Sequence, residues 1–142
     1  MGGLVAIKAS SLCRDRVQAV ITDSAPSDFF EMMSRVLSWK VKRLSRFLVF
    51  SAAVWMRMIL GIDIKDASAL ADIHGLKIPV LIIHGKNDGL VPVEMAETLY
   101  KHADEPKELL VVDNADHVQS IECDPDLYIM SIHDFLNRHI TF

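Results

Sequence analysis

Residues 78–92 of the 142-residue chain read Ile-Pro-Val-Leu-Ile-Ile-His-Gly-Lys-Asn-Asp-Gly-Leu-Val-Pro. The apolar run at the start of this stretch is continuous rather than alternating, which is typical of a parallel strand covered on both faces. Pro79 suits the beginning of such a strand, because proline cannot donate to a central hydrogen-bond ladder. The run closes at Gly85, and the polar residues after it predict a loop at the carboxyl end of the strand.

The segments on either side alternate between helix and strand. Residues 92–102 predict a helix with proline at an early position, residues 108–112 a short buried strand, and residues 125–139 a closing amphipathic helix. Upstream, residues 3–12 are small and apolar, as in a helix packed closely on a sheet, and residues 17–21 are a β-branched run that predicts another strand. This alternation predicts an α/β fold with a parallel sheet.

Composition and charge indicate one soluble globular domain. The chain is 51% hydrophobic and 24% charged, and its net charge of −4 argues against nucleic acid as the main partner. The two cysteines, Cys13 and Cys123, lie far apart and predict free thiols rather than a disulfide or a zinc site. The N-terminus lacks a signal-peptide pattern, and the longest apolar run, residues 47–60, is too short to span a bilayer. We therefore expect a cytoplasmic location.

Two of the predicted loops carry residues suited to proton transfer. Asp88 follows the strand that ends near Gly85, and His117 follows the next strand along the chain. Because the carboxyl ends of neighbouring parallel strands lie at one edge of a sheet, we expect these two side chains to meet. A carboxylate that accepts a hydrogen bond from one imidazole nitrogen orients the ring, and the other nitrogen can then take a proton from a hydroxyl.

Other polar residues compete for these roles. Asp113 and Asp116 could also contact His117, but we interpret both as loop carboxylates, and Asp116 is hindered because it adjoins the histidine. His84 is expected to shape the end of its strand rather than to react. The plain alternative is that Asp88 is a turn residue and His117 a histidine of a surface loop.

Residues 78–92 resemble the acid-bearing segment of α/β-hydrolases, in which an apolar strand runs into His-Gly-x-x-Asp-x-x-Val-Pro. Residues 115–117, Ala-Asp-His, resemble the loop that presents the catalytic histidine of that family, and the order of acid and histidine also matches. The chain thus resembles the C-terminal part of an α/β-hydrolase, with about three parallel strands and flanking helices. The resemblance implies Asp88 as the acid, His117 as the base, and no cofactor or metal.

The first residues, 1–3, resemble the end of the family's nucleophile elbow, Gly-x-Ser-Met-Gly-Gly. On this interpretation the nucleophilic serine would precede Met1, whose backbone N–H would take the place of an oxyanion donor. The alternative is an initiator methionine followed by a cloning remnant. Ser10, Ser11 and Ser24 could substitute for the nucleophile in principle, but none is predicted to lie on a strand-to-helix elbow.

Residues 28–65 resemble the helical cap that covers the active site in this family. Basic residues alternate here with apolar and aromatic ones: Lys40, Lys42, Arg43, Arg46 and Arg57 with Trp39, Leu44, Phe47, Leu48, Phe50, Trp55 and Met58. A basic amphipathic stretch can also lie on a membrane surface or in a partner's groove, but we favour the cap. We expect one partial domain over residues 1–142, with the cap as an insertion.

The resemblance implies a serine hydrolase that cleaves an ester, thioester or amide bond in a small hydrophobic substrate. With the serine missing, the chain by itself is expected to be inactive. Acyl transfer would use the same residues with a different acceptor. An alternative from another class is a non-catalytic hydrolase module that binds proteins or membranes, or associates with itself through an open sheet edge.

Overall fold

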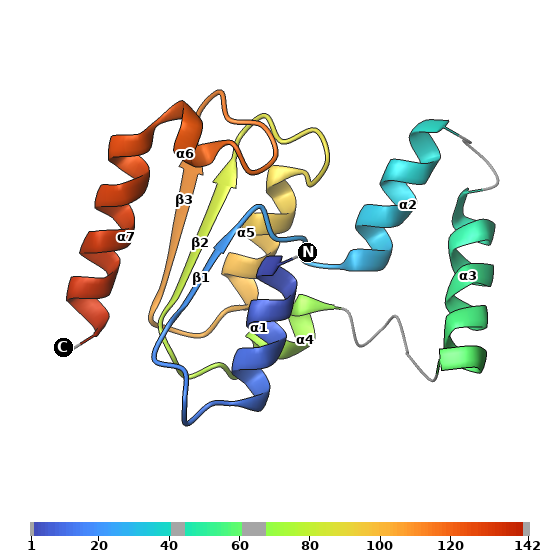
Figure 1. Cartoon of the computed structure of the whole chain (residues 1–142), viewed down its shortest axis with the longest axis horizontal. Helices are drawn as coiled ribbons and strands as arrows, with labels where there is room; N and C mark the ends of the chain where they lie inside the picture. Colours follow the sequence, from blue (N-terminus) through green and yellow to red (C-terminus); the bar gives the residue numbers. More distant parts are fainter. Residues whose placement is uncertain (1, 41–44, 61–67, 141–142) are drawn as a thin grey trace. The chain divides into compact units, whose positions relative to one another are not determined.

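The computed structural model describes residues 2–40, 45–60 and 68–140. The chain divides into two compact units, one formed by Met1–Ser27 with Ala69–Phe142 and the other by Asp28–Ser68 (Figure 1). Residues 61–65 of the expected cap lie outside the described residues, as do Lys42, Arg43 and Leu44. The assignment of residues 28–65 as a cap therefore stays a prediction.

The larger unit is built on a three-stranded parallel sheet. Its strands are β1 (Val20–Asp23), β2 (Val80–Gly85) and β3 (Lys107–Val112), with β2 in the centre. Val80 pairs with Val20 on one side and with Lys107 on the other. Every residue of β2 is buried, as its continuous apolar run predicts for a central strand. The predicted α/β class with about three parallel strands is confirmed.

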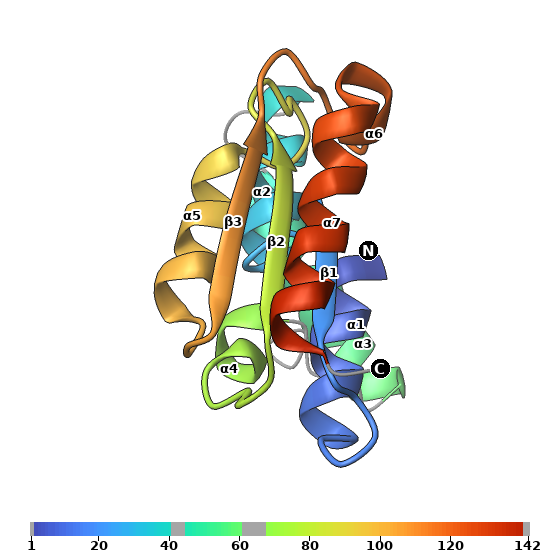
Figure 2. The same cartoon turned by 90° about the vertical axis from the view of Figure 1, so that its left-hand side faces the viewer.

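Helices cover both faces of this sheet (Figures 1 and 2). On one face lies α7 (Pro125–His139), whose fully buried Phe135 packs with Leu81, Ile83 and Val112. On the other face lie α1 (Gly2–Leu12), α4 (Ala69–Ile73) and α5 (Val93–His102). A short helix, α6 (Ser120–Cys123), comes directly before α7. Alternate side chains of β2 thus enter two separate apolar layers.

Helix α1 packs very closely on β1. A Cβ atom at Gly3 would lie 2.7 Å from Cβ of Ala25 and 3.3 Å from Cβ of Thr22, so only glycine permits this distance. Leu4 and Ile7 of the same helix are buried. The small residues in this segment therefore do what the sequence predicts: they let the helix approach the sheet.

Two elements differ from the sequence expectation. The strand expected at residues 17–21 is β1, Val20–Asp23, because the ladder with β2 begins at Val20 and continues to the pair of Asp23 with Ile83. Helix α6 has no counterpart in the sequence pattern, since four residues are too few to show a helical period. Helix α6 directly follows the loop that carries His117. The residues added to β1 lie at the end of that strand, which faces the same loop.

Among its described residues, the smaller unit contains two helices, α2 (Phe29–Lys40) and α3 (Ser45–Leu60). Asp28 accepts a hydrogen bond from the backbone N–H of Glu31 at 2.8 Å, which is the contact of an N-capping aspartate. None of the helices within the described ranges is long and apolar enough to cross a membrane.

Candidate active site

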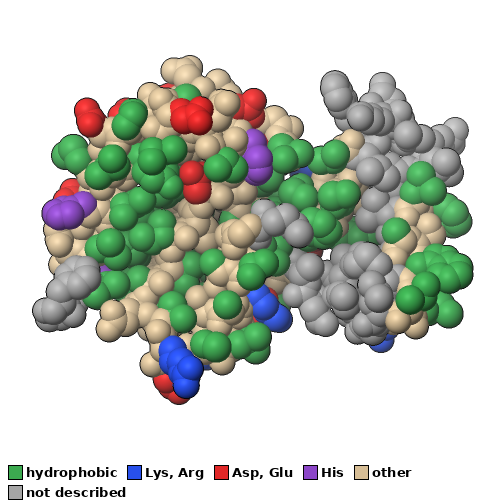
Figure 3. Space-filling view, viewed as in Figure 1, with side chains coloured by type: hydrophobic (Ala, Val, Ile, Leu, Met, Phe, Trp, Pro, Cys, Tyr) green, Lys and Arg blue, Asp and Glu red, His purple; other side chains and the backbone are tan. Residues whose placement is uncertain are grey.

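Asp88 and His117 meet at the carboxyl end of the sheet. Asp88 lies in the loop after β2 and His117 in the loop after β3, and their side chains join at 2.8 Å between Nδ1 of His117 and Oδ2 of Asp88. Figure 3 shows acidic side chains along the same end of the unit, toward which the arrows of β2 and β3 point in Figure 1. The structure thus brings together the two residues chosen from the sequence, while their catalytic roles remain predictions.

The carboxylate of Asp88 is fully buried and held on both sides. Its Oδ1 accepts hydrogen bonds from the backbone N–H groups of Leu90 at 2.9 Å and Val91 at 2.7 Å, and its Oδ2 faces His117. Because an ionised carboxylate only accepts hydrogen bonds, Nδ1 of His117 carries the proton. The Nε2 atom then has a free lone pair, and it has no hydrogen-bond partner among the residues that the structure describes.

His84 contacts the acid loop, which is the loop after β2 that carries Asp88. Its ring is buried, with Nε2 at 2.8 Å from the carbonyl oxygen of Val91 and 3.4 Å from Oδ2 of Asp88. A carbonyl only accepts, so Nε2 is the protonated nitrogen, and the buried Nδ1 atom has no partner within the described ranges. These contacts agree with the structural role expected from the sequence: His84 ties Val91 to the end of β2.

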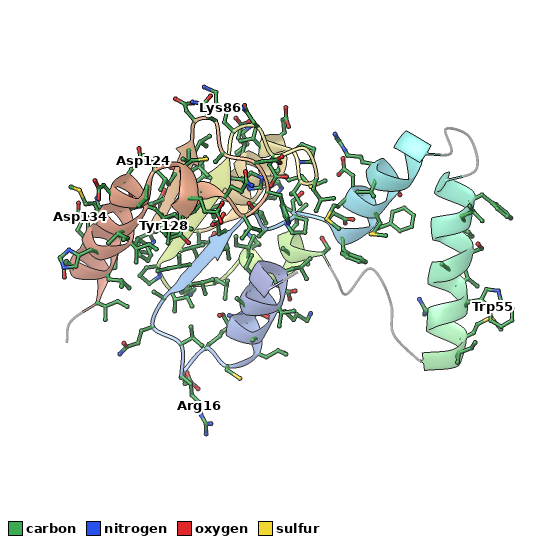
Figure 4. The ribbon with its side chains drawn as sticks, turned by 45° about the horizontal axis from the view of Figure 1, so that its top comes forward. Arg16, Trp55, Lys86, Asp124, Tyr128 and Asp134 are labelled. Atoms are coloured by element: carbon green, nitrogen blue, oxygen red, sulfur yellow. The ribbon has the colours of Figure 1, made fainter. Side chains whose placement is uncertain are left out.

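Backbone hydrogen bonds join the two loops directly. The N–H of Lys86 donates to the carbonyl of Val112, and the N–H of Asn87 donates to that of Ala115, each at 2.9 Å. At the tip of the acid loop, the Lys86 ammonium meets Oδ1 of Asp113 at 2.7 Å, and this hydrogen bond raises the pKa of Lys86 (Figure 4). Asp113, a competitor for His117 in the sequence, therefore has Lys86 as its partner.

Asp116 links the acid loop to the histidine loop through its side chain. Its Oδ1 accepts from the backbone N–H of Gly89 at 3.0 Å and from that of His117 at 2.7 Å. These two hydrogen bonds, the one from Gly89 first, lower the pKa of Asp116. The sequence predicts a plain loop carboxylate at Asp116, because this residue adjoins the histidine. The missed role uses the backbone of His117, and nothing in the sequence indicates that Gly89 would face this carboxylate.

The pH dependence of stability should report this link. The pKa of Asp116 is lower in the folded chain than its usual value of 3.8. The ionised carboxylate therefore stabilises the folded chain above pH 3.8, and this stabilisation is lost as the pH falls through the pKa of the folded chain. Asp116→Asn retains an oxygen acceptor but cannot ionise. The free energy of unfolding by urea should therefore fall less steeply below about pH 4 in Asp116→Asn than in the unmodified chain. Parallel pH profiles of the two proteins would contradict this role.

The serines considered as substitute nucleophiles are engaged elsewhere. Ser10 donates to the carbonyl of Ala6, Ser11 to that of Lys8, and the Ser24 hydroxyl to Oδ1 of Asp23. Met1, the expected oxyanion donor, lies outside the described residues. Within the described ranges, no three His, Cys, Asp or Glu side chains are grouped so that they could hold a metal ion.

Curated proteins from two bacteria illustrate the similarity in sequence. YqkD of Bacillus subtilis is 29% identical over 139 residues, which are 97% of this chain and 46% of that protein. YfhR of Escherichia coli K12 is 37% identical over 60 residues, 42% of this chain and 21% of that protein. The chain thus spans less than half the length of the curated relatives it matches. No protein-family model matches it.

Solved structures show which fold this is. An α/β-hydrolase enzyme from the metagenome of lagoon sediments superposes with a TM-score of 0.64 at 24% identity, over 96% of this chain and 57% of that one. The esterase domain of a Rhodothermus marinus protein gives 0.69 at 20% identity, over 99% and 57%. An esterase of Pyrococcus furiosus gives 0.67 at 23% identity, over 98% and 50%. The chain therefore has the α/β-hydrolase fold over about half the length of these structures.

Proposed function

We propose that the protein with this α/β-hydrolase fold is a serine hydrolase that cleaves an ester, thioester or amide bond in a small hydrophobic substrate. The observation that carries the proposal is the hydrogen bond of 2.8 Å between His117 and Asp88. A surface histidine has no need of a buried carboxylate held by two backbone N–H groups. A histidine that must gain and lose a proton does need one, because the carboxylate stabilises the imidazolium.

In the proposed reaction His117 is the base and Asp88 orients it. The free Nε2 atom of His117 takes the proton of an attacking hydroxyl, and the hydroxyl oxygen forms a bond to the substrate's carbonyl carbon. The same nitrogen then returns the proton to the leaving group, and water repeats the sequence to release the acid. The carboxylate of Asp88 keeps the proton on Nδ1 throughout, so that Nε2 is always the nitrogen that faces the reaction.

The attacking hydroxyl is proposed to come from a serine that is not among the described residues. Ser10, Ser11 and Ser24 donate to other acceptors, and the likeness of residues 1–3 to an elbow supports a serine directly before Met1. The 142-residue chain alone is accordingly proposed to be inactive. The esterases on which the chain superposes support an ester as one of the proposed substrates, and the chain spans about half of their length.

Turnover of p-nitrophenyl butyrate tests the proposal. The assay compares the 142-residue chain, the protein translated with any in-frame codons upstream of Met1, and His117→Ala in each of the two. We expect no turnover by the chain alone and turnover by the extended protein that falls by about a thousandfold or more in His117→Ala.

The outcomes separate the parts of the proposal. Turnover by the 142-residue chain that disappears in His117→Ala would support hydrolysis but contradict the missing nucleophile. An extended protein that turns over no ester, thioester or amide substrate would contradict the hydrolase function. Turnover that survives in His117→Ala would remove His117 from the reaction.

A further inference from the structure

We infer that Ser24 is a positioning residue for His117, acting through the backbone of Val118. This inference rests on the proposed function only for its consequence in catalysis. The contact itself spans 94 positions in the chain: the backbone N–H of Val118 donates to Oγ of Ser24 at 3.1 Å. It joins the end of β1 to the residue that follows the candidate base.

The backbone at Val118 is in a conformation that its own side chain disfavours. Its φ angle is 60°, in the left-handed region, where a β-branched residue is a genuine outlier. The side chain gains little in return, because 53% of Val118 is exposed. Burial of the side chain therefore does not stabilise this turn. The Val118 N–H instead donates a hydrogen bond to Ser24, and this contact stabilises the turn.

Ser24 is itself firmly placed. It is 2% exposed, and its backbone N–H donates to the carbonyl of Ile83 at 3.0 Å, which extends the ladder between β1 and β2 by one residue. Its hydroxyl donates to Oδ1 of Asp23 at 3.2 Å. A hydroxyl has one hydrogen, so once this is given to Asp23 the oxygen can only accept from Val118.

Asp23 in turn is held by the two helices that follow the histidine loop. Ser120 of α6, fully buried, lies with its Oγ 3.3 Å from Oδ1 of Asp23. Tyr128 of α7 extends toward the strands, and its burial, followed by the negative charge of Asp23, raises the pKa of Tyr128 (Figure 4). The hydrogen bond from Val118 to Ser24 therefore joins the C-terminal side of the His117 loop to the end of β1.

The consequence for His117 follows from geometry. Val118 and His117 share a peptide unit, so release of the Val118 N–H would let this turn relax toward negative φ and carry the imidazole with it. A displacement of about 1 Å in a catalytic group can reduce the rate about a hundredfold. Ser24 thus contributes to the alignment of His117 with Asp88 without touching either side chain.

Nuclear magnetic resonance on the 142-residue chain tests this inference without any activity assay. In the unmodified chain, exchange of the Val118 amide should be slowed about tenfold or more relative to an unstructured peptide, although the residue is exposed. In Ser24→Ala, the Nδ1 proton of His117 should exchange about tenfold faster or disappear, as the ring leaves Asp88. Val118→Gly in the Ser24→Ala background should restore it in part, because glycine adopts positive φ without support.

Ser120→Ala is the matched control. It removes a buried hydroxyl from the same carboxylate but makes no contact with Val118, so the His117 signals should stay unchanged. An unchanged Nδ1 proton in Ser24→Ala, or an equal effect in Ser120→Ala, would overturn the inference. If Ser24→Ala does not fold, the amide of Val118 in the unmodified chain decides: protection supports the contact and free exchange overturns it. Both readouts stand even if the protein proves to hydrolyse no ester.

Discussion

Asp88→Asn is expected to reduce turnover by the active form of the protein about ten-thousandfold, with little change in stability. The oxygen of the new carboxamide should take the place of Oδ1, because the N–H groups of Leu90 and Val91 need an acceptor there. The NH₂ group then faces His117 in place of Oδ2. A donor at this position favours an unprotonated Nδ1, so that Nε2 carries the proton and can no longer act as a base.

Asp88→Ala provides the comparison. It removes both oxygens and leaves the N–H groups of Leu90 and Val91 without an acceptor, the latter in a buried position. Each such group costs about 1–3 kcal/mol, so we expect the free energy of unfolding to fall by about 2–4 kcal/mol. Urea unfolding measures this loss of stability in Asp88→Ala. The kcat for p-nitrophenyl butyrate measures the loss of turnover in Asp88→Asn. If Asp88→Asn retains the turnover of the unmodified protein, then Asp88 does not set the tautomer of His117.

Gly85→Ala is expected to lower the free energy of unfolding by about 3 kcal/mol or more and to separate His117 from Asp88. An added Cβ at this last residue of β2 would lie 2.5 Å from the carbonyl oxygen of Ala115 and 2.7 Å from that of Asp116. Both obstacles are backbone atoms, which cannot rotate away as a side chain can. The histidine loop would have to move as a whole, together with its hydrogen bond from Asn87.

Gly89→Ala is the control for this substitution. Gly89 lies in the acid loop, four residues after Gly85. A Cβ atom there would meet only one side-chain oxygen of Asp116, at 4.0 Å. We expect its stability to remain within about 0.5 kcal/mol of the unmodified chain. Urea unfolding and the Nδ1 proton of His117 are the two measurements. Equal stability of Gly85→Ala and Gly89→Ala would show that the loop yields easily and does not depend on glycine.

The pair of Asp88 and His117 could be predicted because each residue follows a recognisable strand. The apolar run before His84 and the shorter run before Asp113 are local patterns, and parallel pairing places the loops after them at one edge. The support around the pair could not be predicted in this way. Asp116 accepts hydrogen bonds from the backbone N–H groups of His117 and Gly89. Every residue except proline has such an N–H group, so the residue types do not indicate which one donates.

Sequence by itself determined the class of fold, the order of the strands and of the helices that flank them except α6, and the pair of residues at the candidate site. Burial drives these features, and apolar runs with their breaks are written locally in the chain. Only the tertiary structure decided how the pair is held. Ser24 and Val118 lie 94 positions apart, and the space beside Gly85 depends on where the loop at Ala115 crosses it. Such contacts depend on distance and direction in the folded chain, which residue identity does not encode.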